Sequence, residues 1–305
     1  MAIKSVQVII NGVTTDLTLN SSTGEYEKTL TAPNKSSWNN NSGHYYPINV
    51  KATDSAGNIA TKNDVDTNLG KLDVNETVAP VSTITSPTEG QLLINAKPTV
   101  TWKVTDNDSG VNPDTISIII DSGSKITSGI VKTAITGGYQ CSYAIASALS
   151  DGNHVIKVDA KDYDGNAAVQ RLVNIVIDIT PPQLNVPTPV NNLVTKNPVI
   201  PIEGNTDDVT SKPCTVTVKC NDSDAKAIDV ASNGAFSSSV TYTDGIKEGT
   251  NVIRITSTDR AGKSTYMDRT VILDTVAPVI GAVKLSKNPV GTGDTFKISV
   301  TVTDA

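Results

Sequence analysis

The chain has 305 residues, of which 37% are hydrophobic and only 4% aromatic, and its formal net charge is −6. The charges are scattered and form no basic face, which disfavours nucleic acid as a partner. No stretch approaches the roughly 18 apolar residues of a membrane span, and the residues after Met1 predict a strand, not a secretory signal.

The composition favours strands and turns over helices. Thr, Ser, Asn and Gly are abundant, and these residues suit strands and turns. We find no long segment with an apolar period of 3.6 residues, so the sequence predicts an all-β protein. With so few aromatic residues, its cores must be small and built from Val and Ile.

The first predicted elements lie in residues 1–76. We expect five strands, at 3–11, 14–20, 24–32, 45–53 and 59–65. The fourth alternates apolar and polar residues and ends in the turn "TDSAGN" at residues 53–58. Five strands are few for a two-sheet module, so one interpretation is that this module lacks its first strands.

The same strand and turn return twice. "KDYDGN" occupies residues 161–166 and "TDRAGK" residues 258–263, and each follows a strand with the same alternation. The Asp-x-x-Gly turn therefore marks a repeated module, with Asp54, Asp162 and Asp259 at equivalent positions.

Proline-bearing segments close each copy. "NETVAP" at 75–80, "DITPP" at 178–182 and "DTVAP" at 274–278 each end a strand, and proline stops a strand and stiffens the joint. These linkers divide the chain into modules at 1–76, 77–179, 180–275 and 276–305, of which the last is only a beginning.

The two central modules predict β-sandwiches of immunoglobulin type. Each has about seven short strands in roughly 100 residues, with turn signals every 8 to 12 residues. In "PTVTWKVTD" the apolar residues alternate with polar ones, which favours a core position for Trp102 over a role as a binding platform. We therefore predict tandem immunoglobulin-like (Ig-like) sandwiches in an extended rod.

These motifs carry a resemblance that covers nearly the whole chain. The "ATDxxGN" turns, the "LxxGxHxVxVxAxDxxGN" element and "DTxAP" resemble tandem bacterial Ig-like domains of surface adhesins and phage tail-associated proteins. The first module is similar to modules in tail proteins of phages and prophages of Gram-positive bacteria. The resemblance implies mechanical and adhesive roles.

The three cysteines predict no disulfide framework. Cys214 and Cys220 lie on one face of one strand, about 20 Å apart, whereas a disulfide needs Cα atoms within about 7 Å. We interpret these two and Cys141 as small buried apolar residues.

No catalytic constellation is evident, and we expect no enzymatic activity. The two histidines, His44 and His154, belong to different modules. No Cys or His pair has the spacing of a zinc site, and no nucleophile elbow or phosphate-binding glycine loop occurs.

Calcium is the ion that the sequence favours, since Ca²⁺ takes six to eight oxygen ligands. A turn aspartate and a linker acid could meet where modules join, as in the calcium-stiffened joints of cadherins and some bacterial adhesins. The alternative is that the turn aspartate only accepts backbone N–H bonds, with Gly relieving strain. Arg260 and Lys263 in the third turn oppose a dication there.

The candidate pairs are Asp54 with Glu76, Asp162 with Asp178, aided by Asp164, and Asp259 with Asp274. Asp106 and Asp108 form another acidic loop.

An aromatic group is the other candidate site. Trp38, His44, Tyr45 and Tyr46 lie in the polar segment "SSWNNNSGHYYP". They could stack on a sugar of a bacterial surface glycan, or they could cover the end of a small, incomplete sandwich, which we favour.

The predicted function is non-enzymatic. We expect a spacer or host-surface contact in a phage or prophage tail, located on the virion and bound to other virion proteins. The alternative is a stalk fragment of an exported bacterial adhesin, located on the cell surface. If the first module lacks strands of the kind that residues 276–305 supply, head-to-tail self-association by strand donation is a further hypothesis. The alternative, which we favour, is that the chain is truncated and its last residues form a frayed tail.

Overall fold

The computed structural model describes residues 2–39, 43–63 and 70–304. Two compact units divide the chain, Met1–Ile177 and Asp178–Ala305. Strands dominate both units, and the described residues contain no α-helix, only a 3₁₀ turn at Tyr242–Asp244. The all-β prediction is confirmed.

No helix in the described part of the chain is long and apolar enough to span a bilayer.

The first module forms a single sheet in the order β3-β2-β1-β4-β5. Its strands are β1 (Ile3–Ile10), β2 (Val13–Leu19), β3 (Tyr26–Glu27), β4 (Ile48–Asp54) and β5 (Ile59–Lys62). The five predicted strands are present, but the third is only two residues long, and residues 64–65 of the fifth prediction lie outside the described residues. Among the described residues before Thr77 no second sheet covers this one, so the module is half of a sandwich.

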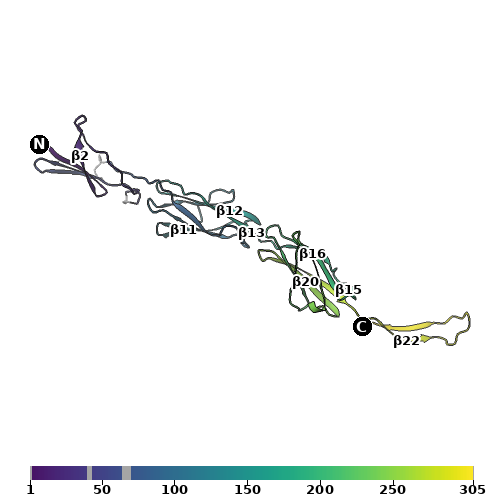
Figure 1. Cartoon of the computed structure of the whole chain (residues 1–305). Coiled ribbons are helices and arrows are strands. Elements are labelled where there is room, and N and C mark those ends of the chain that lie inside the picture. The colour runs from purple at the N-terminus through teal and green to yellow at the C-terminus, as the bar shows by residue number, and fades with distance from the viewer. Residues whose placement is uncertain (1, 40–42, 64–69, 305) are drawn as a thin grey trace. The chain divides into compact units, whose positions relative to one another are not determined.

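The second module, residues 81–177, is a sandwich of two four-stranded sheets (Figure 1). One sheet has the order β10-β11-β8-β6 and the other β7-β13-β12-β9. The strands are β6 (Val81–Ser86), β7 (Gln91–Leu93), β8 (Thr99–Thr105), β9 (Val111–Ile120), β10 (Val131–Ile135), β11 (Gly138–Ala144), β12 (Gly152–Asp162) and β13 (Arg171–Ile177). The first strand of the second sheet, β7, runs parallel to the last, β13.

The inward faces of these sheets form the core of the second module. Trp102 on β8 is fully buried, as its alternation predicts, and Ile156 and Ile175 lie opposite on β12 and β13. Burial of each such side chain contributes about 1.5–3 kcal/mol. On β8 the outward residues, such as Thr101 and Lys103, are polar, and this period of two fixes the strand register.

The third module, residues 178–273, repeats this plan. Its sheets have the orders β14-β16-β19 and β15-β21-β20-β17-β18, and β15 again runs parallel to β21. The strands are β14 (Gln183–Thr188), β15 (Leu193–Thr195), β16 (Ile200–Asp207), β17 (Thr215–Cys220), β18 (Lys226–Ile228), β19 (Ala235–Val240), β20 (Gly249–Thr258) and β21 (Ser264–Leu273). Cys214 and Cys220 are buried thiols here, as is Cys141 on β11, so the cysteine prediction is confirmed.

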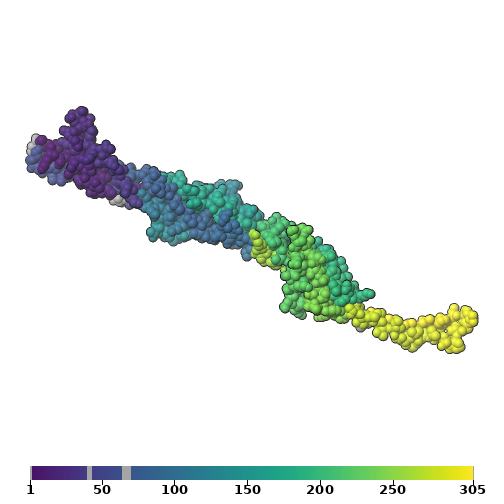
Figure 2. All heavy atoms as spheres, in the orientation of Figure 1, coloured from purple at the N-terminus to yellow at the C-terminus, as the bar shows by residue number. Residues whose placement is uncertain are grey.

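Residues after 276 form one hairpin. Strands β22 (Val279–Leu285) and β23 (Ile298–Thr303) pair antiparallel, and every side chain on them is exposed. Figure 2 shows this hairpin, in yellow, as a thin ribbon of atoms with no second layer on it. The arrangement of the modules as an extended rod stays a prediction.

Candidate functional site

The three Asp-x-x-Gly turns share one geometry. The N–H of each aspartate donates to the residue four positions on: Asp54 to Asn58, Asp162 to Asn166, and Asp259 to Lys263. The glycine of each turn has a φ between 85° and 92°, a conformation that side chains with a Cβ rarely adopt. The aspartate Oδ1 accepts the N–H of that fourth residue at 2.8–2.9 Å, which is the backbone bond that the turn alternative predicts.

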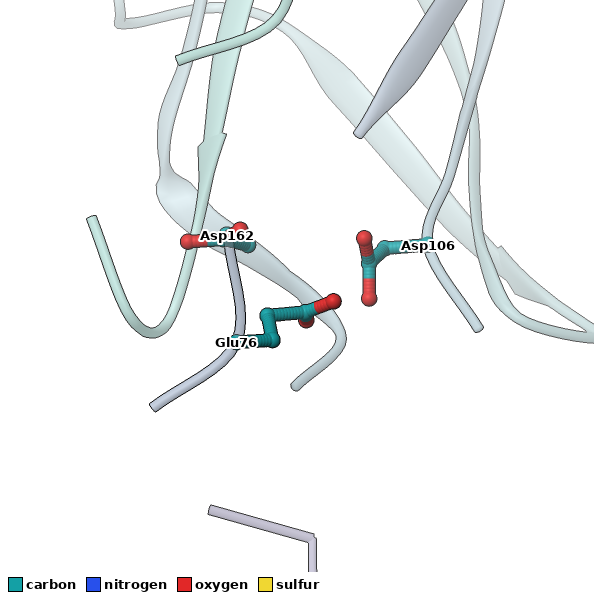
Figure 3. A group of neighbouring side chains, drawn as sticks. All are labelled: Glu76, Asp106 and Asp162. Atoms are coloured by element: carbon teal, nitrogen blue, oxygen red, sulfur yellow. The ribbon is translucent and has the colours of Figure 1, made fainter. Parts of the chain in front are cut away.

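Glu76, Asp106 and Asp162 meet at one end of the second module. One carboxylate oxygen of each lies within 4.8 Å of the others. Figure 3 shows the Glu76 side chain reaching toward Asp106, with Asp162 on its other side. Asp106 and Asp162 are buried and Glu76 is half-buried. We call these three residues the second-module acidic cluster.

Glu76 is held by bonds to two loops of the second module. Its N–H donates to Asp164 Oδ2 at 2.9 Å, and its Oε1 accepts the N–H of Ser109 at 2.6 Å. Burial raises the pKa of Glu76, the bond from Ser109 opposes this, and the charges of Asp106 and Asp108 raise the pKa further. The hydroxyl of Ser109 is buried and has no hydrogen-bond partner.

Asp178, Asp208 and Asp259 form the same arrangement in the third module. One oxygen of each lies within 4.8 Å of the others, and all three residues are buried. Asp208 Oδ1 accepts the N–H of Thr210 and of Ser211, and the Ser211 hydroxyl donates to Asp178 Oδ2. We call these three residues the third-module acidic cluster.

The structure groups the linker acids differently from the predicted pairs. Glu76 lies with Asp162, whereas the prediction joins it to Asp54. Asp178 lies with Asp259, whereas the prediction joins Asp178 to Asp162. The reason is topological: β12 and β20 run toward the end at which the chain enters their own module, so each turn aspartate meets the acid that precedes its module.

Asp54 and Asp274 belong to neither cluster of the described residues. Both oxygens of Asp54 accept bonds from Asn58, and its pKa is lowered, chiefly by the side-chain bond from Asn58. Asp274 Oδ1 accepts the N–H of Val276 at 3.2 Å. Calcium binding at the named acids stays a prediction.

Sequence reasoning missed Asp208, although a signal for it exists. On β8 the inward residues Trp102 and Val104 are followed two positions later by Asp106. On β16 the inward residue Thr206 is followed two positions later by Asp208. In both sandwiches an acid thus takes the next inward position, where alternation would place an apolar residue.

The aromatic group is largely used in packing. The Trp38 ring is stacked on His44 at 3.9 Å on one side and on Tyr163 of the second module at 4.5 Å. Tyr46 is only 2% exposed and donates to the carbonyl of Lys35. The geometry therefore supports the packing alternative for Trp38, His44 and Tyr46.

Tyr45 differs from this packed group. It is half-buried, and the ammonium of Lys71 lies 4.2 Å from the centre of its ring. A sugar contact at Tyr45 stays a prediction.

A hollow of about 650 Å³ lies on the first sheet. Apolar residues of β1, β2 and β4 line it, together with Lys28, residues 30–34 and Leu72. It occupies the face of the sheet that a second sheet covers in the other modules.

Both histidines have structural partners. His154 is bonded through its two ring nitrogens to Asp121 and to the carbonyl of Ser150, and His44 Nδ1 lies 2.6 Å from the carbonyl of Trp38.

Two family models match parts of the chain. Residues 80–158 match a bacterial Ig domain, and residues 182–275 match domain B of glucodextranase. Each match covers less than half of the chain. No curated protein matches it.

Solved structures with similar architecture include bacterial and muscle proteins. Fibronectin(III)-like modules of CbhA from Clostridium thermocellum are 16% identical, with 63% of this chain and 93% of that chain covered and a TM-score of 0.34. A tetra-tandem repeat from the extending region of a large adhesion protein is 18% identical, with 98% and 79% covered and a TM-score of 0.34. An I-band fragment of titin is 14% identical, with 89% and 88% covered and a TM-score of 0.43. The second and third modules are β-sandwiches in tandem, and the bacterial Ig domain match covers most of the second.

Proposed function

We propose that the chain is a non-enzymatic structural or adhesive spacer of Ig-like modules in a phage or prophage tail. The observation that carries the proposal is the repetition of one filled sandwich. Both sandwiches pair their second strand parallel to their last, and both have an aspartate, Asp106 or Asp208, at the end of the same inward face. A folded module with a filled core has a fixed length, so a series of such modules can serve as a spacer between the proteins at its two ends.

The bacterial Ig domain match to residues 80–158 supports a structural or adhesive role. It fits two settings equally: a phage tail, or the stalk of an exported bacterial adhesin. In either setting the partners are other virion or surface proteins, and a surface glycan is a third candidate partner.

Locating the native protein separates these settings. We expect mass spectrometry of gradient-purified phage or induced prophage particles to find its peptides in a fixed ratio to a tail protein. The control is the cell-wall fraction of the same culture, washed free of particles. Recovery from the wall fraction alone would replace the tail proposal with the adhesin stalk. Recovery from neither fraction would overturn both.

Surface contact is tested separately. The fluorescently labelled protein should bind the host cells, and enzymatic removal of wall glycan should abolish the signal if the partner is a glycan. A Tyr45→Ala variant tests the remaining aromatic candidate, with Trp38→Phe as a control that keeps the stacking.

A further inference from the structure

Three carboxylates are buried together at the end of the third module where the chain enters it. Asp178 is 0% exposed, and Asp208 and Asp259 are each 6% exposed. They come from three separate segments: the start of the module, the loop after β16 and the turn after β20. Burial of like charges within 4.8 Å is costly unless something compensates for them.

No side-chain cation provides that compensation in the described residues. The ion pairs of the third module lie elsewhere, on Asp207, Asp244 and Asp268. Arg260 and Lys263, which the sequence places in the turn, form no ion pair with the cluster. The objection that these two residues oppose a dication is therefore weaker than the sequence alone suggests.

One oxygen of the cluster has no partner. Asp259 Oδ1 accepts the N–H of Lys263 at 2.9 Å, but Asp259 Oδ2 is buried and accepts no hydrogen bond. Its carboxyl group is the one whose oxygen lies within 4.8 Å of Asp178 and Asp208. A buried carboxylate oxygen without a donor is costly unless a cation or an ordered water compensates for it.

The other two turns show why this oxygen is left over. Asn58 and Asn166 stand at the fourth position after Asp54 and Asp162, and their side-chain amides donate to the second oxygen at 2.9 and 2.8 Å. The third turn has Lys263 at this position, which keeps the backbone bond but has no amide to donate. The third turn therefore frees a carboxylate oxygen that the other two turns use internally.

We propose that Asp178, Asp208 and Asp259 bind a calcium ion. Three protein carboxylates suit Ca²⁺, which takes six to eight oxygen ligands, better than Mg²⁺, which usually keeps several waters and one or two carboxylates. The hydroxyl of Ser211, which already contacts Asp178, and water supply further oxygens. The site goes beyond the proposed function and does not depend on it.

Calorimetric titration of the 305-residue protein with CaCl₂, after treatment with EDTA, tests the proposal. We expect saturable binding and a higher melting temperature with calcium. Asp259→Asn should lower the bound stoichiometry by one ion, because it keeps the turn and removes the charge. Asp54→Asn makes the same change in a turn outside both clusters and should leave the titration unchanged.

A second pair of variants keeps all three ligands. Lys263→Ala and Lys263→Asn remove the same charge, but only Asn can donate to Asp259 Oδ2 as in the other turns. We expect Lys263→Asn to bind calcium about tenfold more weakly than Lys263→Ala, since the new hydrogen bond competes with the ion. Circular dichroism would check that every variant folds.

Three results would overturn the proposal. One is the absence of any calcium heat in the native protein. Another is an unchanged stoichiometry in a folded Asp259→Asn variant, which would move the ion to the second-module acidic cluster. The third is equal affinity of the two Lys263 variants.

Discussion

His154 on β12 is held between two acceptors in the second module. Its Nδ1 lies 2.8 Å from Asp121 Oδ2 and its Nε2 lies 2.8 Å from the carbonyl of Ser150. A neutral imidazole can donate from only one nitrogen, whereas imidazolium donates from both. Burial lowers the pKa of His154, but the bonds to Asp121 and Ser150 outweigh this and the net pKa is raised.

This geometry predicts a pH-dependent stability of the second module. Because the folded pKa of His154 is raised, its contribution is complete below the unfolded value of about 6.5 and is lost as the pH rises through the folded pKa. His154→Gln should therefore lower the free energy of unfolding by about 1–2 kcal/mol more at pH 5.5 than at pH 8.5. Trp102 fluorescence in a Trp38→Phe background would follow the transition.

Protonation of Asp121 determines the low-pH end of the range in which the His154–Asp121 interaction stabilises the second module. The pKa of Asp121 is lowered: burial alone would raise it, but the bonds from His154 and from the N–H of Val155 prevail. Its contribution is present above the unfolded pKa and is lost as the pH falls through the folded value. Asp121→Asn should remove the same pH dependence as His154→Gln, and an Asp121→Asn variant with native pH dependence would contradict the assignment.

The buried thiols give a second residue-level prediction. Burial raises the pKa of Cys141 and of Cys220 to about 11 and also raises that of Cys214. Since the thiolate is the reactive form, no thiol should react with Ellman's reagent at pH 8 in the folded protein. Three should react in denaturant, and rapid labelling of one in the native state would show that it is exposed.

At the scale of elements, alternation was a reliable guide where one face of a strand is buried. It placed Trp102 inward and predicted the strands that precede the three turns. It failed for residues 24–32, of which only Tyr26 and Glu27 form a strand. No second sheet covers the described part of this module, so burial of one face does not hold these residues in an extended strand.

The acidic clusters were only half predictable. Asp162 and Asp259 could be placed from the repeat, and Glu76 and Asp178 from their linkers. The partner of each turn aspartate could not be predicted. Whether it meets the linker acid before its module or the one after it depends on the direction of the strand that precedes the turn. The stacking of Trp38 was equally hidden, since Tyr163 is more than a hundred residues away in the chain.

Trp38 joins a segment of the first module to the second. Beside its stacking on Tyr163, the N–H of Ser36 donates to Asp108 Oδ1 at 2.9 Å. Trp38→Ala should weaken this local attachment by about 0.5–1.5 kcal/mol, the contribution of one stacked aromatic pair, because only the stack on Tyr163 joins the two modules. Hydrogen exchange at Ser36 and Ser37 would report the loosening.

The matched control is Tyr45→Ala, which removes a half-buried aromatic of the same segment that is not stacked on Trp38. It should leave exchange at Ser36 and Ser37 near the native rate. Equal acceleration by both substitutions would mean that the whole segment, and not the Trp38 stack, makes the attachment.

At the scale of the molecule, two apolar surfaces are uncovered. The hairpin exposes eight large apolar side chains, and the hollow on the first sheet is lined by Ile10, Val13 and Leu30 among others. Exposed apolar surface of this kind favours association. We expect the average mass in sedimentation equilibrium to rise with protein concentration.

Charged substitutions test which surfaces meet. Val300→Lys on β23 should restore the monomer mass, whereas Thr301→Lys on the opposite face should not. Ile10→Lys should also restore it if the hairpin of one molecule docks on the first sheet of another. Association that survives Ile10→Lys but not Val300→Lys would mean that hairpins pair with each other, and a constant monomer mass at all concentrations would remove the hypothesis.

The parallel pairing of β7 with β13 determines how the second module responds to a pulling force. β7 lies near the start of the module and β13 at its end, so tension between the two ends drags these neighbours in opposite directions along their length. Their backbone bonds at Ile175, Val176 and Ile177 are then sheared together instead of being peeled apart one at a time. Because β15 and β21 repeat the arrangement, each sandwich has its own parallel strand pair that resists mechanical extension in shear.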